Sequence, residues 1–219
     1  MNFLKSPVSS EQDEFSRSKS SAKNLHDAAA NSDLETVKEL IESGANIDEI
    51  FSGRTALFAA AVNNNLLLTE YLLDKNANVN TPCGAAGGTA LHVAAEMGHV
   101  HVVKLLHDRG ADLNQLSTFT GVSALHAAVA FDQRKTVIIL LAKGANVNLQ
   151  ITGSSGVYES ADSLFIAEIT GNKEMAKLLV MFGAEVILKS ALKGEPSCII
   201  AFEQLTTTWC KGISKKGKT

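Results

Sequence analysis

The stretch that decides the fold is Gly87-Gly88-Thr89-Ala90-Leu91-His92-Val93-Ala94-Ala95, with Val103-Lys104-Leu105-Leu106 and Gly110-Ala111-Asp112-Leu113-Asn114 behind it. The Leu-x-x-Ala part of this stretch occurs five times, beginning at Leu25, Leu57, Leu91, Leu125 and Leu164. Successive leucines are 32, 34, 34 and 39 residues apart. A period near 33 residues is typical of a stacked repeat protein, which presents an extended surface rather than an enclosed pocket.

Each copy predicts the same sequence of elements. A short helix carries the Leu-x-x-Ala pattern, a turn follows, and a second helix has apolar residues at helical spacing. The second helix is expected to stop where a residue can adopt the left-handed conformation. These stops are Gly44, Asn76, Gly110, Gly144 and Gly183. A short β-like run such as Ala45-Asn46-Ile47-Asp48 and a polar, glycine-containing loop then lead to the next helix. Two such helices cannot bury their apolar face alone, so we expect the copies to stack.

These residues resemble ankyrin repeats, whose pattern is Gly-x-Thr-Pro-Leu-His-x-Ala-Ala, a Gly-His turn and Val-x-x-Leu-Leu-x-x-Gly-Ala-Asp-Val-Asn. The resemblance covers 22–188, and it implies an all-α ankyrin-repeat solenoid of five helix-turn-helix units with β-hairpin-like loops. The chain departs from the pattern at the proline. Ala56, Ala90, Ala124 and Ser163 stand there instead. The fold should tolerate alanine, which is a strong helix former.

The sequence divides into four parts around this pattern. Residues 1–21 are rich in serine and charge and are expected to be a disordered lead. The repeat domain is 22–188, with approximate repeats 22–50, 51–84, 85–118, 119–157 and 158–188. The junction 149–160 is longer than its counterparts, which predicts an enlarged, mobile finger. Residues 189–210 are expected to form a C-terminal capping helix, and 211–219 a basic flexible tail.

Charge and cysteine content argue against several classes of protein. The net charge of −3 leaves −7 on 23–210, because the tail carries four lysines and 1–22 is neutral. A mildly acidic body is a poor surface for nucleic acid. The tail is interpreted as a solvated end, with a localisation signal as the alternative. Three cysteines without zinc-site spacing fit a reducing compartment, so we expect a cytoplasmic protein, with nuclear location as an alternative. No apolar run is long enough to span a membrane.

The sequence offers no pattern typical of an enzyme or a cofactor site. His26, His92 and His126 share one repeat position, where the resemblance implies structural hydrogen bonds to the neighbouring loop. His99 and His101 point to different sides of a helix, which is unsuited to a metal ion. No phosphate-binding loop or nucleophile elbow is present. We therefore expect no catalytic, metal or cofactor-binding residue. An enzyme with 187–219 as its catalytic part is the alternative, and that segment is too short for a core.

The resemblance implies a binding surface instead. In ankyrin-like stacks the concave face comes from the finger tips and from the two residues after Ala-Ala. Several positions there are apolar, which favours a partner site. The predicted partner-binding residues are Phe51, Arg54, Val62, Met97, Phe119, Phe131, Tyr158 and Ile169. In the alternative interpretation, Phe51 and Phe119 pack against adjacent fingers of the same molecule.

We expect a non-catalytic module that binds a protein partner as an adaptor, scaffold or inhibitor, and that is monomeric alone. The alternatives are a translocated bacterial effector, which would act in the host cytosol, and a regulatory inhibitor subunit of an enzyme or transcription factor. A second hypothesis makes the chain a substrate, because some ankyrin-like proteins are hydroxylated at a loop asparagine. The matching positions here are Asn80, Asn114 and Asn148.

Overall fold

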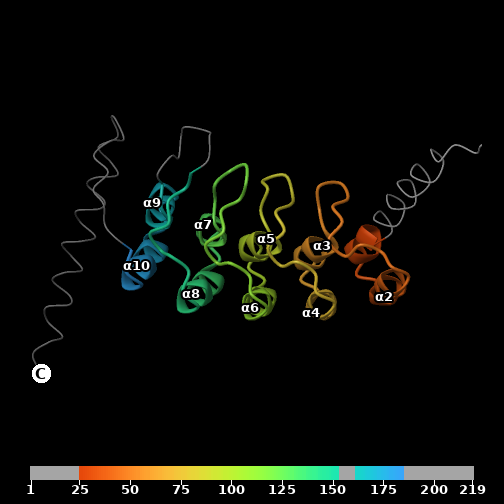
Figure 1. Ribbon diagram of the computed structural model, residues 1–219. Coiled ribbons are helices and arrows are strands. Elements are labelled where there is room, and N and C mark those ends of the chain that lie inside the picture. The colour runs from red at the N-terminus through yellow and green to blue at the C-terminus, as the bar shows by residue number, and fades with distance from the viewer. Residues whose placement is uncertain (1–24, 153–160, 185–219) are drawn as a thin grey trace, which may run out of the picture.

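The computed structural model describes residues 25–152 and 161–184, and their helices come in pairs (Figure 1). Residues 25–30 are helical and pair with α2 (Leu34–Glu42). The following pairs are α3 (Ala56–Val62) with α4 (Leu66–Asp74), α5 (Ala90–Glu96) with α6 (Val100–Asp108), α7 (Ala124–Ala130) with α8 (Arg134–Ala142), and α9 (Ser163–Ile169) with α10 (Lys173–Met181). The predicted lead, capping helix, tail and most of the 149–160 junction lie outside the described residues.

The pairs stack side by side in an extended row. Figure 1 shows the first helices in one layer, the second helices in another, and the loops projecting beyond the first helices. The described residues therefore form the all-α repeat solenoid that the sequence predicted. The layer between the helices is the core: Leu57, Leu91 and Leu125 face it from the first helices, and Leu72 and Leu106 from the second. Burying each of these leucines contributes about 1.5–3 kcal/mol.

The helix boundaries follow from local chemistry. The hydroxyl of Thr55 accepts a hydrogen bond from the Phe58 backbone N–H, which caps the start of α3. The five predicted stops all adopt positive φ, between 65° and 98°, so this prediction is confirmed. The β-like run predicted at Ala45-Asn46-Ile47-Asp48 is wrong, because a turn forms there and Asp48 N–H donates to the side chain of Asn46.

Side chains at the start of the second helices also tie neighbouring pairs together. Asn65 is short, and its side chain caps its own helix by accepting from Leu68 N–H. His99 and Gln133 occupy the equivalent position and are longer. They reach back to the preceding pair, where they bond the carbonyl oxygens of Val62 at 3.1 Å and Glu96 at 3.0 Å. Asn172, at the start of α10, does both: it accepts from Met175 N–H, and its amide donates to the carboxylate of Asp132 in the preceding unit at 2.7 Å.

Candidate functional site

Backbone hydrogen bonds connect the projecting loops, called fingers below (residues 51–54, 83–88, 117–122 and 149–152). Gly84 N–H donates to the Gly53 carbonyl of the preceding finger. Thr118 N–H donates to Gly87 at 2.9 Å, and the next residue donates to Ala86 at 3.2 Å. Thr152 N–H, in the last of these fingers, donates to the Gly121 carbonyl at 3.4 Å. Each finger therefore supports the next, and side chains on their tips start from an ordered backbone.

Phe119 lies on the tip of the third of these fingers. Its backbone is one of those bonded to the preceding finger, and its side chain is 67% exposed. A β-carbon added to Gly87 would come within 2.9 Å of the Phe119 ring, so the ring stands directly over the backbone of the neighbouring finger. Phe119 therefore contacts that finger, as the alternative interpretation expected, and still exposes most of its ring.

Three further apolar side chains are exposed at the ends of consecutive first helices. Met97 follows α5 and Phe131 follows α7 at the same position of the repeat, and Ile169 is the last residue of α9. Their exposed fractions are 46%, 58% and 43%. The helices α5, α7 and α9 are neighbours in the first layer (Figure 1). The three side chains therefore stand at the same end of consecutive helices, and they are called the apolar row below.

The remaining predicted partner-binding residues behave differently. Phe51 is half-buried, and its ring lies 5.9 Å from the ring of His26 in a tilted arrangement. Arg54 is exposed, with its guanidinium 5.8 Å from the centre of the Phe58 ring. Val62 is half-buried at the end of α3, with its carbonyl bonded to His99. Tyr158 lies outside the described residues. Among the predicted partner-binding residues that the structure describes, the exposed apolar ones therefore lie over α5, α7 and α9 rather than evenly along the stack.

The shared histidines have the expected structural role in two of three copies. In His92, Nδ1 accepts from the Thr89 backbone N–H at 3.0 Å, so Nε2 carries the proton and donates to the Val122 carbonyl at 2.9 Å. His126 does the same between Ser123 and Leu149. Burial lowers the pKa of both rings, that of His126 to about 4, so both are neutral at physiological pH. Within the described residues, His26 makes no such hydrogen bond.

The candidate hydroxylation residues connect adjacent loops. Asn80 accepts from Asp112 N–H at 2.9 Å and donates to the Gly110 carbonyl at 3.2 Å. Asn114 accepts from Asn146 N–H at 2.8 Å, and the amide of Asn148 donates to Gly183 at 3.3 Å. These bonds give the three asparagines a structural role, and their modification stays a prediction.

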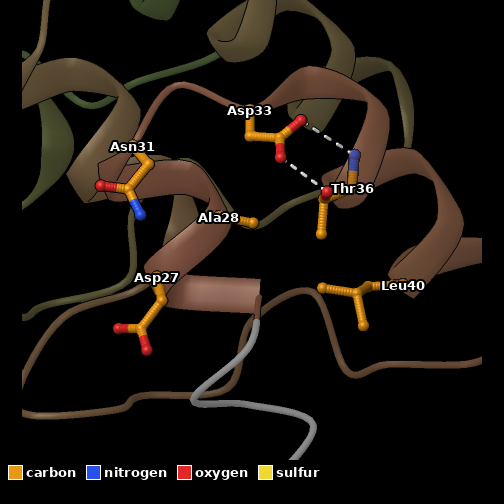
Figure 2. A pocket seen from close by; sticks show the side chains of 6 residues that line it. All are labelled: Asp27, Ala28, Asn31, Asp33, Thr36 and Leu40. Carbon is orange, nitrogen blue, oxygen red and sulfur yellow. Dashed lines mark hydrogen bonds between the residues drawn. The ribbon is translucent and has the colours of Figure 1, made fainter.

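A hollow of about 310 Å³ lies at the N-terminal end of the stack (Figure 2). Leu40 and Ala28 lie beside Asp27, Asn31, Asp33 and Thr36 in its lining. Leu40 is half-buried, whereas the leucines at the equivalent position, such as Leu72 and Leu106, are fully buried. The hollow is thus the end face onto which a preceding repeat would stack. Asp33 uses both carboxylate oxygens to bond Thr36, which caps α2.

The described residues contain no cluster of three or more His, Cys, Asp or Glu side chains suited to a metal ion. Within the same ranges, no helix is long and apolar enough to cross a membrane. One unusual ionisable group was missed from the sequence. Glu168 is half-buried at a position that alanine or valine fills in the other copies. An alignment of the five copies would have shown a glutamate at this otherwise apolar position. Whether its carboxyl group is buried, and so whether its pKa is shifted, is seen only in the structure.

A family model of ankyrin repeats matches residues 25–117 and 83–151, which together span more than half of the chain, and it counts three copies. This chain belongs to the ankyrin repeat family. Beyond the matched region, α9 and α10 continue the same pairing and stacking. No curated protein matches the chain. Ankyrin repeats are protein–protein interaction modules, and the family is typically non-catalytic.

Proposed function

We propose that this ankyrin repeat protein binds a protein partner without catalysis, through the apolar row together with Phe119. The observation that carries the proposal is the exposure of Met97, Phe131 and Ile169 on three adjacent helix pairs. Large apolar side chains gathered on one surface are typical of interaction sites, and aromatic residues dominate the binding energy of interfaces. The bonded fingers support it further, since a rigid site loses less conformational entropy on binding.

The partner is expected to lie along the first helices and to reach the fingers. Phe119 stands on the finger that leads into α7, and Phe131 follows the end of the same helix. A seven-residue helix is about 10 Å long, so the two aromatic side chains bracket a short stretch of surface. Phe51 and Arg54 lie on the finger that leads into α3, two helix pairs before the α7–α8 pair, and they would contribute only to a longer interface. The proposed role is that of an adaptor, scaffold or inhibitor in the cytoplasm. The alternatives, a translocated effector and a regulatory inhibitor subunit of an enzyme or transcription factor, would use the same kind of surface.

Affinity capture from the source cell's lysate tests the proposal. The bait would be the full chain, compared with a Met97→Ala, Phe119→Ala, Phe131→Ala variant. A matched control replaces three exposed apolar residues of the second helices, Leu67, Ile138 and Met181, by alanine. A protein retained by the wild type and the control, and lost by the first variant, would support the site. Equal capture by both variants would show that the partner binds elsewhere.

A further inference from the structure

Glu168 occupies a position that is otherwise reserved for small apolar side chains. The equivalent residues of the other copies are Ala29, Ala61, Ala95 and Val129, which are at most 1% exposed. They lie where one first helix packs against its neighbours. Glu168 is the second-last residue of α9, and it is half-buried in this place. Glu168 therefore places a long side chain with an ionisable carboxyl group where the other copies have a small apolar residue. Partial burial of the carboxyl group disfavours its ionised form.

The groups around Glu168 do not offset its charge. Asp162, the buried residue that caps the start of α9, repels a second negative charge at the other end of this short helix. His126, the one titratable residue of α7, is neutral at physiological pH, and Asp132 just after α7 is a further carboxylate, which accepts from the Asn172 amide at 2.7 Å. From α10, Lys177 pairs with Glu174 at 2.7 Å, and Lys173 is exposed. In the part of the chain that the structure describes, no ion pair to Glu168 forms. Burial, followed by repulsion from Asp162, raises its pKa to about 7.

We propose that Glu168 acts as a proton-controlled switch of the α9–α10 pair, which packs firmly while the carboxyl is neutral and loosens when it is charged. The direction follows from linkage: the packed state holds the proton more tightly than an opened, solvated state, whose carboxyl has the ordinary pKa. The stabilising effect of the proton is therefore complete below about pH 4.5 and is lost as pH rises through about 7. This titration falls in the physiological range.

The switch would also affect the apolar row, because Ile169, a member of this row, directly follows Glu168 in α9. This consequence, and only this one, rests on the proposed partner site. A looser α9 would present Ile169 less precisely, so binding that uses this residue would weaken as pH rises. The switch itself is a property of the unbound chain, and it can be tested without any partner.

Hydrogen exchange followed by mass spectrometry tests the switch on the full chain. The measured quantity is the protection of peptides from residues 161–184, corrected for the intrinsic pH dependence of exchange. With folded and unfolded pKa values of about 7 and 4.5, the opening constant should rise about tenfold between pH 6 and 8. Glu168→Gln should keep the low-pH protection throughout. Glu174→Gln, which removes an exposed carboxylate paired with a lysine, should behave as the wild type.

A second readout keeps the proposal testable if one variant folds poorly. NMR titration of the Glu168 side-chain carboxyl in the wild type should give a midpoint near 7, and a midpoint between 4 and 5 would overturn the proposal. Wild-type protection that does not change between pH 6 and 8 would also overturn it. Glu168→Ala restores the residue found in three other copies, and it should remove the pH dependence as Glu168→Gln does. A normal pH response in both variants would place the titrating group elsewhere.

Discussion

The ring of His126 joins two successive units of the stack, because its Nε2 atom lies 2.9 Å from the carbonyl oxygen of Leu149. At the same time Nδ1 accepts from the backbone N–H of Ser123, at the start of α7. One neutral imidazole thus satisfies a helix terminus in its own unit and a carbonyl in the next loop. The bond to Leu149 needs the Nε2 proton and the bond to Ser123 needs a free Nδ1, so protonation at Nδ1 would break the arrangement.

This geometry predicts that His126 destabilises the protein in mild acid, a contribution opposite in sign to the one proposed above for Glu168. Burial lowers the pKa of His126 to about 4, while the unfolded chain has the ordinary value near 6.5. The stabilisation is complete above pH 6.5 and declines as pH falls through the folded pKa, by up to about 3 kcal/mol for this residue. Urea unfolding at pH 7.5, 6 and 5 measures the loss in a Glu168→Gln background, which removes the opposing titration of Glu168. His126→Phe, which copies the residue found at Phe58 and Phe165, should reduce this pH dependence. An unchanged dependence in that variant would contradict the assignment.

Removal of one hydroxyl is expected to stabilise the fold. Ser163 begins α9, is fully buried, and its oxygen has no hydrogen-bond partner within the described residues. Alanine fills the equivalent place in three other copies. Ser163→Ala should therefore raise the free energy of unfolding by about 1 kcal/mol, measured by urea denaturation. Ser123→Ala is the matched control and should lower stability by about 1 kcal/mol, because the Ser123 hydroxyl caps α7. A destabilised Ser163→Ala variant would show that this hydroxyl has a partner.

Most of the fold could be predicted because its determinants are local and repeated. The helix stops follow from single residues such as Gly110 and Asn76, whose positive φ the structure confirms. The contacts between units were harder to predict, since they depend on which side chains meet across about 30 residues. The sequence alone does not show that His99 bonds Val62, or that Phe119 stands over Gly87. For the candidate site, exposure separates Phe131 from Phe51, and only the packed structure gives exposure.

The contact between fingers predicts a strong effect of a single methyl group. Gly87 has φ of 67°, and a β-carbon there would lie 2.8 Å from the Thr118 β-carbon and 2.9 Å from the Phe119 ring. Gly87→Ala should therefore both strain the backbone and separate the fingers, at a cost of about 2–3 kcal/mol. Gly53→Ala is the control, since Gly53 also has positive φ but open space around it, and it should cost only about 1 kcal/mol. Equal losses in thermal or urea unfolding would show that the fingers do not pack as described.

The asparagine bridges allow a graded test of how the loops hold adjacent units together. Asn80 both accepts from Asp112 N–H and donates to the Gly110 carbonyl, whereas Asn114 accepts one bond, from Asn146 N–H. Asn80→Ala should thus cost about 1–2 kcal/mol, and Asn114→Ala about half as much, because each net hydrogen bond contributes about 0.5–1.5 kcal/mol. Urea unfolding of both variants measures the difference. A larger loss at Asn114 would mean that solvent readily replaces the bonds of Asn80. Because hydroxylation at the β-carbon would leave both amide bonds in place, a hydroxylated chain should unfold no more easily than the unmodified one.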